Sequence, residues 1–159
     1  MQDVRAPRPW VQIATICQSA IVEANTNALS VIKVTDRLAV AGFTQEMQPQ
    51  PINVTLAILL KSDQMNGQYQ VKIRCVSPNG TSTDGPEIPF LFEGNDRGVQ
   101  AVFPIGFIAT EQGVYWFEVL LEEELLTRIP LRVMYQRIQN LPGMQMPPGM
   151  GMQPPGGGH

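Results

Sequence analysis

The sequence is dominated by short runs in which apolar and polar residues alternate, separated by turn-forming residues. In "YQVKIRC", which ends at Cys75, apolar residues and polar residues such as Lys72 and Arg74 take alternate positions. Successive side chains of a β-strand point to opposite faces, so a period of two predicts a strand with one buried face. An amphipathic helix would need apolar residues three or four positions apart. The alternation therefore favours β architectures.

Such runs recur along the chain and predict seven or eight strands. Turn signals separate them at Asn25 to Asn27, at Asn66-Gly67 and at Ser77-Pro78-Asn79-Gly80. Asn-Gly between two alternating runs is a strong hairpin signal, so we expect a hairpin turn at residues 66–67. The expected strands cover residues 11–19, 29–35, 52–60, 69–75, 88–92, 99–107, 115–121 and 125–133.

The stretch "GVYWFEVLLEEELLTRIPLRV", from Gly113 to Val133, allows two interpretations. Its centre resembles a helix, but a helix over residues 118–127 would be shorter than the roughly 12–15 residues at which isolated helices become marginal. Pro130 would end it, and no capping residue flanks it. Both ends alternate, with Leu125 and Ile129 on the expected inner face of the second strand. We therefore expect a β-hairpin that turns at the acidic triplet, residues 122–124.

Together these patterns predict an all-β fold: a single antiparallel β-sandwich of the immunoglobulin-like, Greek-key type. We expect the domain to cover residues 10–138, after an N-terminal extension of residues 1–9. Residues 139–159 form a tail that is rich in Met, Pro and Gly and carries no charge, a composition that predicts disorder. Two alternatives for this tail are a Cu(I) site built from Met and His159, and proline docking on a partner's aromatic groove.

Charge limits the possible partners. Charged residues make up 16% of the chain, against about 25% in typical soluble proteins. Either Gln, Asn and Thr replace charges on exposed faces, or part of the surface is covered by another subunit or a partner. The net charge of −3, without a basic cluster, argues against nucleic-acid binding.

No apolar run approaches the roughly 18 residues of a membrane span, and no secretory signal is visible. We expect a cytoplasmic protein, with an exported mature form as the alternative.

The inventory of reactive side chains is small. His159 is the only histidine, which removes Ser-His-Asp and Cys-His mechanisms and a histidine-based zinc site. Cys17 and Cys75 lie on the apolar parity of two strands, so we expect buried free thiols, with an inter-sheet disulfide as the alternative. Residues 94–98 lack the Lys and the following helix of a phosphate-binding loop.

Paired carboxylates could still support acid–base chemistry. The candidates each lie where a turn or a solvated strand face would place a carboxylate in any case. We therefore expect no enzymatic activity and assign no catalytic, cofactor-binding or metal-binding residue. These candidates are Asp36, Asp63, Asp84, Asp96 and Glu118.

Several segments together resemble a known family. They are "CQSAIVEANTNALSVIKVTDRL" from Cys17, an apolar strand behind Pro49 and Pro51, "VKIRCVSPNGT", and the final stretch that contains Gly113-x-Tyr-x-Phe and Pro130-Leu-x-Val. In this order they are similar to a family of small bacterial proteins classed as a domain of unknown function. The resemblance covers roughly residues 11–133. It implies a bacterial β-sandwich and brings no catalytic residue.

Three function classes follow. We favour a non-catalytic protein-binding or assembly module that uses loops and strand edges to bind a partner or a second copy. The second is an exported carbohydrate- or envelope-associated module, in which Trp10, Trp116 and Tyr135 would be stacking residues rather than packing residues. The third is a carboxylate-based enzyme, which a deep pocket with two carboxylates would support.

Overall fold

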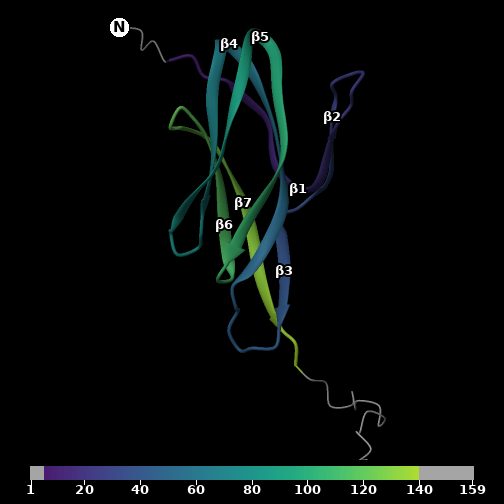
Figure 1. Ribbon diagram of the computed structural model, residues 1–159, viewed down its shortest axis with the longest axis vertical. Helices are drawn as coiled ribbons and strands as arrows, with labels where there is room; N and C mark the ends of the chain where they lie inside the picture. Colours follow the sequence, from purple (N-terminus) through teal and green to yellow (C-terminus); the bar gives the residue numbers. More distant parts are fainter. Residues whose placement is uncertain (1–5, 140–159) are drawn as a thin grey trace, which may run out of the picture.

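The computed structural model describes residues 6–139, and all regular structure within them is β-strand (Figure 1). The all-β prediction is therefore confirmed. Seven strands form in the order β1 (Trp10–Val22), β2 (Leu29–Val34), β3 (Arg37–Gly42), β4 (Gln50–Val76), β5 (Ser82–Ala109), β6 (Gly113–Leu121) and β7 (Glu124–Arg137). The 20 residues from 140 onward, with nearly all of the expected tail, lie outside the described part.

Strands β4 and β5 form one long antiparallel ribbon. Their pairing runs from Val76 opposite Ser82 to Gln50 opposite Ala109. A tight turn closes the ribbon, in which the Gly80 N–H donates to the Ser77 carbonyl at 2.9 Å. Figure 1 shows the two strands running together to the same end of the molecule. Because both strands bend near their middle, the two halves of the ribbon come to face each other.

The predicted hairpin turn at Asn66-Gly67 is wrong. The ladder continues through this point, with Asn66 opposite Glu93 and Gly67 opposite Phe92. The register is irregular between Lys61 and Asn66, and Gly67 has a φ of 106° that suits glycine. The turn-forming residues therefore bend a continuous strand instead of ending it. Residues 94–98 form the matching bend in β5, so four expected strands merge into two.

The sheet is mixed, not purely antiparallel as expected. All strands belong to one sheet of order β2-β1-β4-β6-β7-β3, with β5 also paired to β4. β3, which was not expected, pairs in parallel with β7, from Arg37 opposite Arg132 to Gly42 opposite Arg137. Alternation reports which face of a strand is buried and gives no information on the direction of its neighbour. The expected pair of separate antiparallel sheets is replaced by one sheet that folds over itself.

The core lies between the facing parts of this sheet. Aromatic contacts join parts that are not hydrogen-bonded neighbours: the ring of Phe107 on β5 lies 5.2 Å from Tyr115 and 5.4 Å from Phe117 on β6. Burial of such side chains supplies most of the driving force for folding. Large side chains that are fully buried include Ile16, Leu56, Ile58, Leu60, Ile73, Phe90, Phe92 and Leu131.

The β6–β7 hairpin confirms the predicted turn at the acidic triplet. Glu122 and Glu123 have φ of 45° and 71°, as a two-residue hairpin turn of type I′ requires. The Glu122 carboxylate accepts a hydrogen bond from the Gln70 N–H at 2.8 Å. One detail was wrong: Leu125 is exposed and Leu126 is buried, because the register shifts beside the turn.

Candidate functional site: an apolar cleft beside the outer edge of β5

An apolar cleft of about 580 Å³ lies where the two ends of β5 approach each other. One wall comes from residues 81–86 at the start of β5, and the opposite wall from residues 104–108 near its end. The floor comes from β4 and β6, with Ile73, Cys75, Tyr115 and Phe117. Residues about twenty positions apart on one strand thus form a single site, because the ribbon folds over.

Glycine and proline shape both walls. A Cβ on Gly85 would lie 2.9 Å from the Ile73 carbonyl oxygen, so glycine is needed for this close approach to β4. Pro86 and Pro104 line the cleft and have no N–H to donate, as is typical of edge strands. Within the described residues β5 pairs with β4 alone, so its outer edge is unpaired along both walls.

The polar groups of the floor are bound or protonated. The Tyr115 hydroxyl donates to the Glu111 carbonyl at 2.8 Å and is therefore unavailable to a ligand. Burial raises the pKa of the Cys75 thiol to about 11, so the thiol is neutral near pH 7. Cys17 and Cys75 are both free thiols, as expected. Cys17 is buried, whereas Cys75 is half-buried and contributes to the cleft, which corrects the expectation that both are fully buried.

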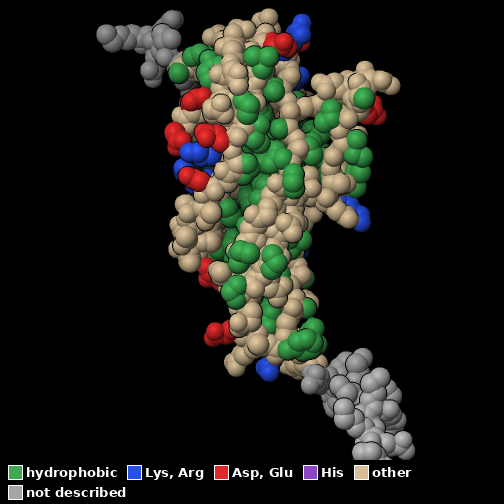
Figure 2. Space-filling view, in the orientation of Figure 1, with side chains coloured by type: hydrophobic (Ala, Val, Ile, Leu, Met, Phe, Trp, Pro, Cys, Tyr) green, Lys and Arg blue, Asp and Glu red, His purple; other side chains and the backbone are tan. Residues whose placement is uncertain are grey.

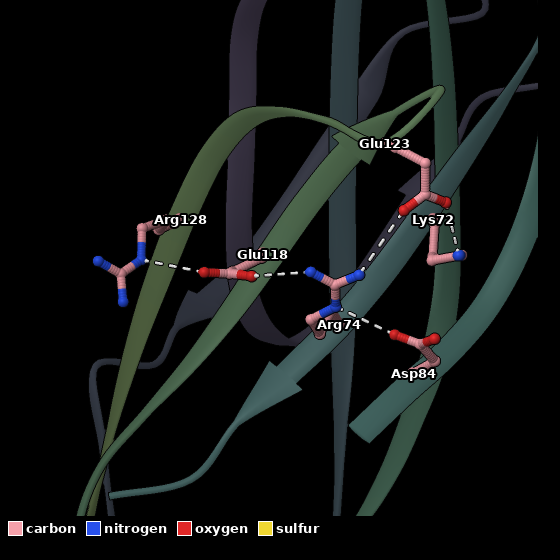
Figure 3. A network of polar contacts seen from close by, with 6 residues as sticks. All are labelled: Lys72, Arg74, Asp84, Glu118, Glu123 and Arg128. Carbon is pink, nitrogen blue, oxygen red and sulfur yellow. Dashed lines mark hydrogen bonds and ion pairs between the residues drawn. The ribbon is translucent and has the colours of Figure 1, made fainter. Parts of the chain in front are cut away.

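A network of charged side chains borders the cleft at Asp84 (Figure 3). Arg74 on β4 lies at its centre, with its Nε 3.0 Å from Asp84 Oδ1 and its Nη1 3.9 Å from Glu118 Oε2. The hydrogen bond from Arg74 lowers the pKa of Asp84. Glu118 also pairs with Arg128 at 3.6 Å, and the Arg128 guanidinium lies 4.3 Å from the centre of the Trp116 ring. The network therefore connects β4, β5, β6 and β7 on the outer face of the sheet.

The acidic triplet takes part in this network without forming a cluster of carboxylates. Glu123 Oε1 accepts from Lys72 Nζ at 2.8 Å, while Glu124 pairs with Arg8 at 3.4 Å. With Glu122 bound to the backbone of β4, each of the three carboxylates has a different partner. Within residues 6–139, no group of three His, Cys, Asp or Glu side chains is arranged to hold a metal ion.

The structure separates the carboxylates named from the sequence into three places. Asp84 and Glu118 come together through Arg74, and Asp63 and Asp96 line a hollow at the bend of the ribbon. Asp36 lies beside Arg37, whose hydrogen bond lowers the pKa of this carboxyl. Of these five residues, Asp84 alone lines the apolar cleft. A carboxylate with a lowered pKa, held by arginine, is poorly suited to proton transfer near neutral pH.

A family of unknown function, DUF6941, has a model that matches residues 12–134. The chain belongs to this family. The resemblance inferred from the sequence is therefore confirmed, and the match covers strands β2 to β6 in full, with most of β1 and β7.

No curated protein matches this member of the DUF6941 family. Among solved structures, one match is the crystal structure of an immunoglobulin-like protein from Pseudomonas aeruginosa. It is 14% identical, covers 82% of this chain and 99% of the other, and has a TM-score of 0.36. Within residues 6–139, no helix is long and apolar enough to cross a bilayer.

Sequence reasoning did not identify the cleft. Most of its lining residues looked like ordinary strand residues, and Cys75 and Asp84 had been singled out for other reasons, as a buried thiol and a candidate carboxylate. The glycines and prolines of β5 were a usable signal, since Gly85-Pro86, Pro89 and Pro104 mark a strand with an unpaired edge. Which edge segments meet could not be inferred, because that depends on the bend of the ribbon.

Proposed function

We propose that this protein is a non-catalytic binding module whose cleft holds an apolar, extended segment of a partner protein. The observation that carries the proposal is the position of the cleft, between two unpaired edge segments of β5 and over an apolar floor. An unpaired edge offers main-chain donors and acceptors to an added strand, while pockets beside it select side chains. An apolar floor favours Leu, Met or aromatic side chains.

Binding is favoured over catalysis by the state of the reactive groups in the cleft. Asp84 is paired with Arg74, and the Cys75 thiol stays protonated near pH 7. The only histidine of the chain is His159. A nucleophile activated by a neighbouring base, as covalent catalysis needs, is therefore not supported in this cleft. Two free thiols also fit the reducing cytoplasm that we propose as the location.

The test compares two substitutions on the same strand. Ile108 borders the cleft and Leu91 lies outside it, and both side chains are 59% exposed. Peptides selected from a displayed library on the wild-type protein should be rich in apolar residues. Ile108→Lys should weaken their binding at least tenfold by placing a charge at the cleft, whereas Leu91→Lys should bind normally. Equal binding by both variants would place the peptide site elsewhere.

Self-association is a second candidate, carried by the β1–β2 hairpin. This hairpin lies at one side of the molecule (Figure 1), with its turn held to β5 by a hydrogen bond from the Gln100 side chain to the Asn27 carbonyl at 2.8 Å. Its exposed aliphatic residues include Ile21, Ile32 and Val34. Strand β2 is also an edge of the sheet. Sedimentation equilibrium should show a dimer or larger species that Ile32→Lys with Val34→Lys converts to monomer. A wild-type monomer at high concentration would exclude this mode.

A further inference from the structure

A second hollow, of about 320 Å³, lies at the bend of the β4–β5 ribbon and shares no residue with the apolar cleft. Three adjacent strands contribute to it: Trp10 from β1, Lys61 and Asp63 from β4, and Asn95 and Asp96 from β5. The register explains the grouping, because Trp10 is paired with Lys61 and Asp63 is paired with Asn95. The hollow combines one large aromatic ring with several polar side chains.

Trp10 has the open ring face that a stacking site needs. It is 68% exposed, and no aromatic or cationic group within residues 6–139 covers its ring. Of the two other aromatic candidates, Trp116 is covered by the Arg128 guanidinium, and Tyr135 has its hydroxyl bound to the Thr44 carbonyl at 2.7 Å. An exposed tryptophan beside polar groups is unusual for packing and typical of recognition.

The polar groups of the hollow include both donors and acceptors. The side-chain carboxylates of Asp63 and Asp96 make no ion pair or hydrogen bond with another described residue. Lys61 Nζ donates to the Asp96 carbonyl at 3.1 Å, which fixes an ammonium group in the hollow. Two carboxylates accept hydrogen bonds, the ammonium donates, and the Asn95 amide does both.

Asp63 and Asn95 lie opposite each other where the register of the β4–β5 ladder is irregular. Both have left-handed backbone angles, with φ of 52° and 53°, which Asp and Asn adopt more readily than other side-chain-bearing residues.

We propose that this hollow binds a neutral saccharide, independently of the peptide function proposed for the cleft. The indole would stack on the apolar face of a sugar ring, as its open surface and the shallow hollow permit. Each sugar hydroxyl both donates and accepts, which matches the carboxylates, amide and ammonium around Trp10. An organic cation is the competing occupant, because it could also stack on Trp10 and the two carboxylates of the hollow outnumber the Lys61 ammonium; the test below distinguishes it from a sugar.

The test uses three neutral hexasaccharides, cellohexaose, maltohexaose and hexa-N-acetylchitohexaose, with the full chain in saturation-transfer NMR and calorimetry. At least one should bind, and Trp10→Ala should weaken binding at least tenfold. Asp63→Asn with Asp96→Asn should also weaken it. Phe43→Ala is the matched control, since Phe43 is 72% exposed and lies outside the hollow. Circular dichroism should show the same fold for every variant.

Two outcomes would overturn the saccharide site: no binding of any hexasaccharide at millimolar concentration, or equal binding by wild type and Trp10→Ala. Saturable binding of tetramethylammonium at Trp10, in place of a sugar, would also contradict it. Ile108→Lys should leave saccharide binding unchanged. The saccharide proposal and the peptide function of the cleft can therefore be refuted independently of each other.

Discussion

The side chain of Tyr115 connects the core to the turn before β6. Its hydroxyl donates to the Glu111 carbonyl at 2.8 Å and accepts from the Glu111 N–H at 3.3 Å. Its ring is 1% exposed and packs on Phe107. A hydroxyl that returns to the backbone a few residues upstream resembles the tyrosine corner known from immunoglobulin-like domains. One residue therefore fixes both the turn and the floor of the cleft.

Replacing Tyr115 with Phe should lower the free energy of unfolding by about 1–3 kcal/mol, because the partly buried peptide groups of Glu111 lose their partner. Urea denaturation measures the change. Tyr69→Phe is the control, since the Tyr69 hydroxyl makes no hydrogen bond within residues 6–139. The control should change stability by less than about 0.5 kcal/mol. Similar losses in both variants would show that the corner contributes nothing specific.

The Cys75 thiol makes stability depend on alkaline pH. Burial raises its pKa from 9.0 to about 11, so the folded state keeps a proton that the unfolded chain releases. The free energy of unfolding should therefore fall as pH rises from about 9 to about 11. Cys75→Val should lose this part of the dependence, as urea denaturation at several pH values will show. Parallel curves for the two proteins would contradict the assignment, because Cys17 is present in both and Cys75 is the thiol that differs.

At the scale of elements, β3 is held in place by one close contact as well as by its pairing with β7. A Cβ on Gly42 would lie 2.6 Å from the Tyr135 hydroxyl oxygen. That hydroxyl donates to the Thr44 carbonyl at 2.7 Å and so ties the segment after β3 to β7. Gly42 thus leaves space for the end of the Tyr135 side chain, which a larger residue would displace.

Gly42→Val should destabilise the protein by about 1–3 kcal/mol, because the added side chain displaces the Tyr135 ring. Thermal unfolding measures the loss. Adding Tyr135→Ala to Gly42→Val should recover part of it, since the space is then available. A double variant with the summed loss of the two single variants would show that the two sites act independently.

The sequence predicted the strands better than their connections. Alternation located β1, β2, β6 and β7 because each has one buried face, and the hairpin at Glu122 was inferred despite its lack of Gly or Asn. The sequence did not reveal that Asn66-Gly67 bends a strand. Residues that favour left-handed backbone angles occur both in hairpin turns and in β-bulges. The cleft was missed for this reason. The carboxylates around Arg74 were named singly, and only the fold showed which of them share a partner.

At the scale of the whole molecule, charge is sparse and uneven. Figure 2 shows hydrophobic side chains along the middle of one face and charged side chains gathered toward its margins. Charged residues are 16% of the chain, and several of them are used in the network around Arg74. Such a surface is suited to contact with a partner, since few charges would need to lose water on binding.

Deleting residues 141–159 should leave the melting temperature unchanged, because the buried core described here consists of residues from Ile16 to Val133. Differential scanning calorimetry tests this. The truncated chain should also keep peptide binding and any self-association, as both proposed surfaces lie in the described part. Loss of assembly or of metal uptake on truncation would make the tail the functional element.

The folded-over ribbon also suggests an order of assembly. The β4–β5 ladder begins at the short turn between Val76 and Ser82, so pairing can proceed outward from contacts that are close in sequence. The parallel pairing of Arg37 with Arg132 joins distant parts of the chain and requires β7 to be in place. Contacts of this range are slow to form. A folding intermediate, if one accumulates, should therefore contain the ribbon with β3 still unpaired, and during synthesis β3 would remain without its partner until the last strand is made.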